Sequence, residues 1–270
     1  MLSIVTDEIS FDPETAVSIA WKWGLRAFEL RRCYTQRAPY YDEMFFELLP
    51  SLRANFDGIR FTAVSPGLFK LPAGHWLVEH EAGLKFDASM DLAELVGARV
   101  VVLFGLDRAE GEREAEPPQN IIDHFGGLAR RAGKRGLTLA VEIESKSYVD
   151  SGQAGARLAA AVGSPAFGIN LQFWNEKTTG DAWDEGFAAA LPHVKHVHLK
   201  GCTRTGKGVR TAVPGSEDDD FDWPARLAAL KGSGYTGAVS IETHMKPRLE
   251  KSEACAASAR ELLAAAGIEE

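Results

Sequence analysis

Short apolar segments alternate with longer amphipathic segments along the whole chain. The apolar segments are rich in branched and aromatic residues, which is typical of buried parallel strands. We predict strands near residues 2–6, 26–31, 60–65, 99–104, 138–143, 167–172, 194–199 and 237–242. The amphipathic segments have helical spacing, and several are followed by a glycine that can end a helix. We predict helices near residues 13–23, 41–56, 81–97, 119–135, 151–162, 182–190, 223–233 and 250–266.

This alternation of strand and helix, repeated eight times, predicts an α/β fold with a single (β/α)8 TIM barrel. An open, doubly wound sheet is the structural alternative. Such a sheet usually carries a glycine-rich phosphate turn after its first strand, and the segment TDEIS is no such turn. A barrel of 270 residues commonly forms one domain, so we expect residues 1–270 to be a single domain.

The composition argues against several classes of partner. The net charge is −8, and the lysines and arginines are scattered, which is unlike a nucleic-acid-binding surface. No apolar run is long enough to span a bilayer, and MLSIVTDEIS does not resemble a targeting segment. The three cysteines, Cys33, Cys202 and Cys255, are far apart and are expected to be reduced. We therefore expect a cytoplasmic protein without nucleic-acid or membrane partners; the sequence leaves open whether it forms a homo-oligomer.

Four predicted strands end in a side chain that could bind a metal ion. These side chains are Glu142, Gln172, His198 and Glu242. In a parallel barrel the carboxyl ends of all strands meet at one rim, where such enzymes build their sites. Two carboxylates, an amide oxygen and an imidazole suit one divalent ion such as Mn²⁺, Mg²⁺, Co²⁺ or Zn²⁺.

Strand alternation places further polar residues on the same inner face. Side chains two residues apart point the same way, so Glu144 accompanies Glu142, Lys200 accompanies His198, and His244 accompanies Glu242. Burying so many ionisable groups is costly unless they are compensated. A bound cation would compensate them. The alternative is a set of ion pairs, for instance of Glu142 with Lys200 or His198, that simply fills the barrel.

The chemistry of these ligands indicates proton transfer next to a carbonyl group. A divalent ion would coordinate adjacent oxygens of a hydroxy-carbonyl compound and make the neighbouring C–H bond acidic. Glu142 and Glu242 could then remove and return a proton from opposite sides. This describes an isomerase or epimerase of a sugar, keto-sugar or related polyol that works through an enediolate, with the two glutamates as acid and base.

The residues that would contact the substrate are a separate prediction. Arg31 could pair with a substrate carboxylate or phosphate; the alternative is an ion pair with Glu29 or a neighbouring loop. Glu144 could bind a substrate hydroxyl or shuttle protons. Aromatic loop residues could form an apolar wall against the substrate, although such residues are about as often plain packing. They are Phe69, His75, Trp76 and Trp174.

Several motifs resemble the xylose isomerase-like barrel superfamily and, within it, the sugar phosphate isomerase/epimerase group. These motifs are TDEIS, GLRAFELR, SPG, AVEIE, HVHLK and, most specifically, DWPARLAALKGSGYTGAVSIE. The resemblance covers nearly the whole chain. It implies that the metal ligands are Glu142, Gln172, His198 and Glu242, that the two glutamates are acid and base, and that Lys200 follows the histidine as is common in the group.

The chain departs from the group at two places. Where the group usually has an aspartate followed three residues later by a histidine, this chain has Gln172 and Asn175, and Gly201 replaces a frequent aspartate. A neutral amide is a weaker ligand than a carboxylate. These departures affect the expected metal affinity and reaction more than the expected fold.

Two other functions remain as alternatives, and a third is disfavoured. A metal-dependent dehydratase or lyase would use the same first proton abstraction on a related hydroxy-carbonyl compound. A catalytically impaired barrel would bind a metabolite without turnover, with Gln172 and Asn175 as marks of lost catalysis. An abasic-site endonuclease would need more metal ligands and a basic surface, which this chain lacks.

Overall fold

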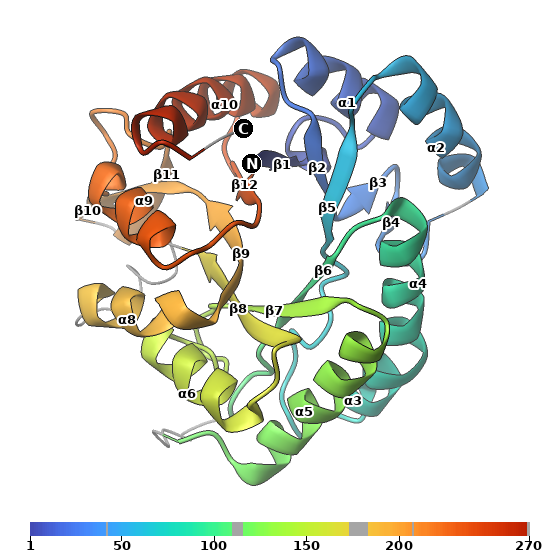
Figure 1. Cartoon of the computed structure of the whole chain (residues 1–270), viewed down its shortest axis with the longest axis vertical. Helices are drawn as coiled ribbons and strands as arrows, with labels where there is room; N and C mark the ends of the chain where they lie inside the picture. The colour runs from blue at the N-terminus through green and yellow to red at the C-terminus, as the bar shows by residue number, and fades with distance from the viewer. Residues whose placement is uncertain (42, 110–115, 173–182, 207, 269–270) are drawn as a thin grey trace. The chain divides into compact units, whose positions relative to one another are not determined.

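A computed structural model describes residues 1–41, 43–109, 116–172, 183–206 and 208–268 of the chain. Eight strands form a closed barrel with the order β1-β12-β9-β8-β7-β6-β5-β2, which confirms the predicted (β/α)8 class (Figure 1). Each strand lies within one or two residues of its predicted position. The strands are β1 Leu2–Val5, β2 Ala27–Leu30, β5 Arg60–Val64, β6 Val100–Phe104, β7 Thr138–Glu142, β8 Phe167–Gln172, β9 Val194–Leu199 and β12 Val239–Ile241.

The helices follow the strands in the predicted alternation. At the start of α1 the Asp12 side chain accepts a hydrogen bond from the Glu14 amide, and α4 ends at Gly97, one of the expected helix-ending glycines, with a φ of 78°. The helices are η1 Thr6–Glu8, α1 Pro13–Lys22, α2 Glu43–Asn55, α3 Leu77–His80, η2 Glu81–Lys85, α4 Phe86–Val96, α5 Gln119–Lys134, α6 Gly152–Val162, α8 Trp183–Ala190, η3 Leu191–His193, α9 Trp223–Gly232 and α10 Arg248–Ala265.

The chain divides into two compact units, which we describe separately. The first unit comprises residues 1–62 and 197–270, and here β1 pairs with β12 on one side and β2 on the other. Helices α1 and α10 lie outside these strands (Figure 1). The apolar side chains of Ile4, Val197 and Ile241 are fully buried, so one face of each strand packs against the helices, as the alternation predicts.

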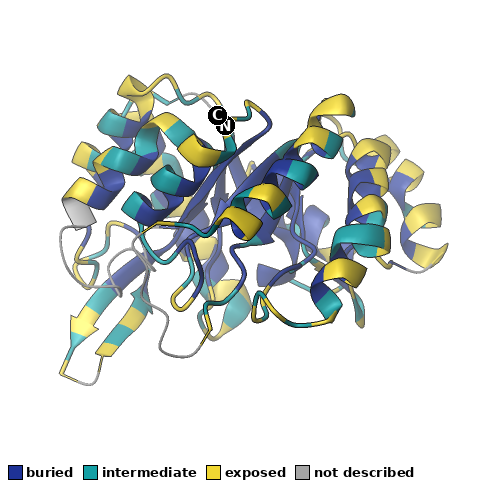
Figure 2. Cartoon of the chain, turned by 90° about the horizontal axis from the view of Figure 1, so that it is seen from below, coloured by how far each residue is buried: buried dark blue, intermediate teal, exposed yellow. Residues whose placement is uncertain are grey.

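The second unit comprises residues 63–196 and contains β6, β7 and β8 in parallel register. Glu142, at the end of β7, lies level with Phe104 on β6 and Asn170 on β8. Helices α5 and α6 lie outside these strands (Figure 1). In both units the barrel strands are mostly buried, while the helices carry exposed residues on their outer faces (Figure 2).

Two antiparallel hairpins in the first unit were not expected from the sequence. One pairs β3 (Arg32–Cys33) with β4 (Gln36–Arg37) after β2, and the other pairs β10 (Gly201–Thr205) with β11 (Gly208–Ala212) after β9. The second segment, GCTRTGKGVRTAV, is glycine-rich and has little apolar alternation, so its sequence gives no strand signal. Both hairpins follow the carboxyl ends of barrel strands, where barrel enzymes build their sites.

Gly168 on β8 provides a test of packing in the second unit. A Cβ atom at this position would overlap the His193 backbone carbonyl and the Lys195 side chain. Gly168→Ala is therefore expected to lower the free energy of unfolding by about 1–3 kcal/mol, as for other overpacked sites. Urea unfolding followed by circular dichroism measures this change. Gly232→Ala on α9, where a Cβ meets open space, is the control; equal stability of the two variants would contradict the packing argument.

Two further properties concern the helices and the cysteines of the described residues. None of the helices in the described ranges has the length and hydropathy needed to cross a bilayer. All three cysteines are free and buried, and burial raises the pKa of the Cys255 thiol to about 12. A thiol with so high a pKa is a poor nucleophile at neutral pH.

Candidate metal and active site

Ionisable side chains gather at the carboxyl ends of β1, β2, β9 and β12 in the first unit. All of these ends point to the same rim, because the four strands are parallel neighbours in the barrel. Six of these residues are buried and one, His244, is exposed; Arg31 is partly exposed. The group consists of Asp7, Glu8, Glu29, Arg31, His198, Lys200, Glu242 and His244.

His198 lies between two buried carboxylates. Its Nε2 is 3.0 Å from Glu29 Oε1, and its Nδ1 is 3.5 Å from Glu242 Oε2. Burial by itself would lower the pKa of His198, but the charges of Glu29 and Glu242 outweigh burial and raise it well above the usual value. Glu29 thus holds the imidazole at Nε2, and the other ring nitrogen, Nδ1, faces Glu242.

Glu242 is surrounded by cationic groups. Its carboxylate lies 2.6 Å from Arg31 Nη1, 2.8 Å from Lys200 Nζ and 3.1 Å from His244 Nε2. Burial opposes ionisation, but Lys200 and His198 hold the pKa of Glu242 well below its ordinary range. Glu242 is therefore a carboxylate throughout the neutral pH range.

Arg31 connects the loop after β1 to Glu242. Its guanidinium contacts Asp7 at 3.1 Å, Glu8 at 2.6 Å and Glu242 at 2.6 Å. Burial opposes the charge, but the three carboxylates hold the pKa of Arg31 above its ordinary value. Of the two roles considered from the sequence, the structure shows the ion pair, and its partners are the loop acids Asp7 and Glu8 rather than Glu29.

Lys200 and His244 complete the group around Glu242. Lys200 Nζ lies 3.3 Å from His244 Nδ1, and the His244 backbone amide donates to Glu8 Oε2 at 2.9 Å. The His244 side chain is 48% exposed, whereas that of Lys200 is 5% exposed. His244 is thus the member of the group that solvent or a ligand reaches first.

Glu142 and Gln172 lie together in the second unit. Both side chains are buried, and Gln172 Nε2 donates to Glu142 Oε1 at 2.9 Å. Because an amide nitrogen has no lone pair to offer a metal, the amide oxygen is the ligand atom that Gln172 can supply. The two predicted ligands at the ends of β7 and β8 are therefore direct neighbours.

The substrate residues predicted in the second unit are more dispersed. Glu144 pairs with Lys70 at 3.0 Å, and His75 stacks on Trp76 with ring centroids 5.8 Å apart. Trp76 is 75% exposed, whereas the ring of Phe69 is fully buried against His124 and Phe125. Phe69 is therefore a packing residue, not part of an apolar wall. Trp174 lies outside the described residues, as does Asn175.

The buried donors of the first unit fit a divalent ion. Glu242 and His198 offer a carboxylate oxygen and an imidazole nitrogen that face one another, and Glu29 holds the other ring nitrogen, as is usual for metal-binding histidines. Glu8, Glu242 and His244 also bring ligand atoms within 4.8 Å of one another. Glu8 Oε1 and Glu242 Oε1 both contact the Arg31 guanidinium, whereas Glu242 Oε2 is the oxygen that faces His198, so His198 with Glu242 Oε2 is the better candidate.

The sequence analysis missed Asp7 and Glu8 and assigned no catalytic role to Glu29. The signal was present: TDE follows the first strand directly, and Glu29 shares the inner face of β2 with Arg31. Acidic residues just after a barrel strand belong to the catalytic rim by topology alone. Their pairing with Arg31 and His198 required the strand order.

The contact between Glu29 and His198 can be tested in the metal-free protein. Glu29→Gln removes one of the two charges that raise the pKa of His198, so this pKa is expected to fall toward the ordinary histidine value. The pKa of His198 is higher in the folded than in the unfolded state. The pair with Glu29 therefore contributes its whole stabilisation below the unfolded-state pKa, and this contribution is lost as the pH rises through the folded-state pKa. An NMR titration of the His198 ring measures the shift; an unchanged pKa would contradict the contact.

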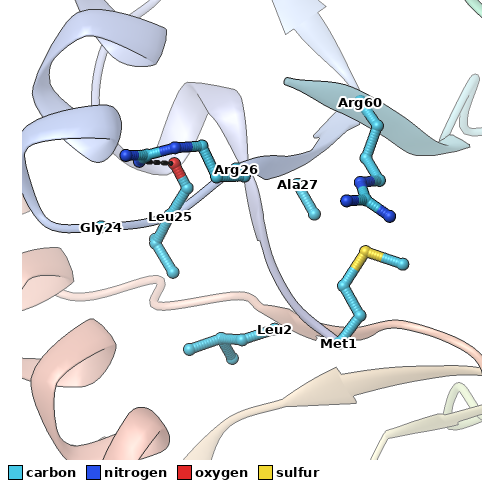
Figure 3. A pocket seen from close by; sticks show the side chains of 7 residues that line it. All are labelled: Met1, Leu2, Gly24, Leu25, Arg26, Ala27 and Arg60. Carbon is cyan, nitrogen blue, oxygen red and sulfur yellow. Dashed lines mark hydrogen bonds between the residues drawn. The ribbon is translucent and has the colours of Figure 1, made fainter. Parts of the chain in front are cut away.

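Two pockets of the first unit lie at the opposite ends of the strands. One, of about 140 Å³, is lined by Met1, Leu2, Gly24, Leu25, Arg26, Ala27 and Arg60 (Figure 3). The other, of about 380 Å³, lies beside Tyr235 and Gly237, before β12. Residues at the amino ends of barrel strands usually serve stability rather than catalysis. Neither pocket is near Glu242.

Comparisons with known proteins give a family and a set of relatives. The family model described as xylose isomerase-like TIM barrel matches residues 17–266. L-ribulose-5-phosphate 3-epimerase UlaE of Shigella flexneri serotype 5b is 29% identical over 175 residues. The match covers 62% of this chain and spans 59% of the length of that relative.

Solved structures share the fold at lower identity. The IOLI protein with a bound zinc atom superposes with a TM-score of 0.78 at 19% identity, covering 98% of both chains. The probable 3-DHS dehydratase AsbF from Bacillus anthracis superposes with a TM-score of 0.74 at 14% identity, covering 96% of this chain and 98% of that one. At these identities the likeness shows the fold alone.

Proposed function

The chain belongs to the xylose isomerase-like TIM barrel family, and we propose that it is a divalent-metal-dependent isomerase or epimerase of a sugar, keto-sugar or related polyol. The observation that carries this proposal is the buried pair of His198 and Glu242, supported by Glu29 on one side and Lys200 on the other. The match to a sugar phosphate epimerase gives independent support for the class of substrate.

We further propose that Glu142 and Gln172 complete the metal ligands. They end β7 and β8, and His198 and Glu242 belong to the ends of β9 and β12, strands that follow one another in the barrel order. Three of these side chains can supply a charged oxygen or an imidazole nitrogen, and Gln172 supplies an amide oxygen. This donor set contains no thiolate and suits Mn²⁺, Mg²⁺, Co²⁺ or Zn²⁺.

The acid–base roles follow from the charge states of the two glutamates. The ion, when bound, polarises the substrate carbonyl and acidifies the adjacent C–H bond. Its cationic neighbours keep Glu242 ionised and also make it a weaker base, so Glu242 can accept the proton in the first step only because the ion acidifies the C–H bond. Glu142 would return the proton from the other side of the substrate, with Lys200 and His244 binding substrate oxygens next to Glu242.

Solvent exchange tests this function directly. The protein is incubated in D₂O with Mn²⁺, Mg²⁺ or Co²⁺ and a panel of ketoses, polyols and their phosphates, and products are followed by NMR. Deuterium at the carbon next to the carbonyl, together with an epimer or isomer, supports the proposal. An unsaturated or newly formed keto product would establish a dehydratase, and binding without any exchange would establish a binding barrel.

A further inference from the structure

Two arginines stack on one phenylalanine ring beside the candidate active site. The guanidinium carbons of Arg32 and Arg248 lie 4.7 Å and 4.5 Å from the centroid of Phe11. Phe11 is 36% exposed, so the ring holds the two cationic groups at the surface of the first unit. Stacking on an aromatic face fixes a guanidinium and leaves its N–H donors able to bind an anion.

The position of this Phe11 cluster (Phe11, Arg32 and Arg248) follows from the barrel order. Phe11 follows β1, Arg32 follows β2, and Arg248 begins α10 after β12. These three strands are consecutive neighbours, and their carboxyl ends form part of the rim that carries Glu242. Arg31, the residue before Arg32, forms an ion pair with Glu242, so the cluster is next in sequence to a residue of the candidate site.

The charges of the cluster are not balanced by nearby acids. Arg31 contacts three carboxylates, whereas neither Arg32 nor Arg248 has a carboxylate within ion-pair distance among the described residues. Arg37 lies directly opposite Arg32 in the β3–β4 hairpin, and like charges in that position destabilise a strand pair. Arg32 and Arg248 are therefore two cationic groups, without a carboxylate partner among the described residues, that an anion could bind.

The start of α10 adds to the attraction. Arg248 is its first residue, and the N-cap residue Pro247 provides no side-chain acceptor for the amides of the first turn. The amino end of an 18-residue helix carries a partial positive charge. An oxyanion that binds these guanidinium groups would be favoured by both effects.

We propose that Arg32 and Arg248, held on Phe11, bind the terminal anionic group of the substrate, a phosphate or a carboxylate. This inference rests on the proposed function, because it names the end of the substrate that lies away from the reacting carbon. Arginine forks match either oxyanion in bidentate fashion. The anion would anchor one end of the carbon chain while the other end reaches Glu242.

Binding measurements without turnover test the site. Calorimetry compares a ketopentose phosphate, a five-carbon sugar acid and the uncharged ketopentose on the metal-loaded protein. We expect one anionic ligand to bind more tightly than the uncharged sugar. Arg32→Gln and Arg248→Gln should each weaken that ligand by about tenfold or more, as expected for losing a hydrogen bond to a charged group, with little effect on the uncharged sugar. The ligand that binds more tightly, the phosphate or the sugar acid, identifies the terminal group of the substrate as a phosphate or a carboxylate.

Arg60→Gln is the matched control, because Arg60 is an exposed arginine of the same unit at the opposite ends of the strands. The inference is overturned if no anionic ligand binds more tightly than the uncharged sugar, if the two variants weaken all ligands equally, or if Arg60→Gln has the same effect. Its failure is distinguishable from failure of the proposed function, because anion binding is read without proton exchange. A barrel that binds the anion but exchanges no proton would retain this site and lose the isomerase assignment.

Discussion

Glu142→Gln and Glu242→Gln are each expected to lower turnover by about 10²–10⁴-fold, the usual contribution of general acid–base catalysis. Glutamine keeps the shape of either side chain but cannot carry the proton. The measurement is the rate of deuterium exchange and product formation on the substrate found in the screen. Glu261→Gln, an exposed position on α10, is the control for the substitution itself. Undiminished turnover in either variant would remove that glutamate from the acid–base role.

The two variants should differ in stability. In Glu142→Gln the new amide oxygen can still accept the hydrogen bond from Gln172, so the fold should be little affected. In Glu242→Gln the buried Lys200 and His198 lose a charged partner, and breaking one side of a buried ion pair typically costs about 3–5 kcal/mol. Thermal unfolding therefore separates loss of chemistry from loss of stability, and Glu142→Gln is the cleaner test of catalysis.

His198→Ala is expected to remove the bound metal. The native protein should hold about one equivalent of a divalent ion, because the four proposed ligands form one four-coordinate site. Elemental mass spectrometry measures this ratio. Glu29→Gln should give an intermediate result, about 10–100-fold weaker binding, because it removes only the carboxylate that orients the imidazole. His80→Ala on α3, an exposed histidine, should retain the ion.

The same experiment has a pH dependence of definite sign. Metal and proton compete for His198, and the two carboxylates beside it raise the pKa of the free imidazole. Metal occupancy should therefore fall as pH falls, starting above the pH at which an ordinary histidine takes up its proton. Retention of the ion in His198→Ala would show that the metal lies elsewhere. A native protein that binds none of the four ions would instead favour a binding barrel in which Gln172 has replaced an essential carboxylate.

The fold was predictable because it depends on local patterns. Each barrel strand is a short apolar run, and each is followed by a segment of helical spacing, so periodicity alone located the eight barrel strands. The two hairpins were missed because their residues are polar or glycine and their pairing gives little apolar signal. The β10–β11 segment illustrates this: only Cys202 and Val209 among its central pairs are apolar.

The residues on the inner face of the site were also predictable, but the contacts between their side chains were not. Alternation placed Glu29, His198, Lys200 and Glu242 on one face, and all four are buried. Alternation could not show that Glu29 binds His198, that Arg31 reaches Asp7 and Glu8, or that Phe11 gathers Arg32 and Arg248.

The sequence by itself thus determined the class of fold, the family and the residues that face the barrel interior, because side-chain direction repeats every second residue along a strand. The tertiary structure decided which of these residues meet. β1 lies between β12 and β2, so contacts join Arg31 to Glu242 and Glu29 to His198 across more than a hundred residues of sequence. Such pairs arise from the closure of the barrel, which no local periodicity encodes, and they set the charge states on which the proposed chemistry depends.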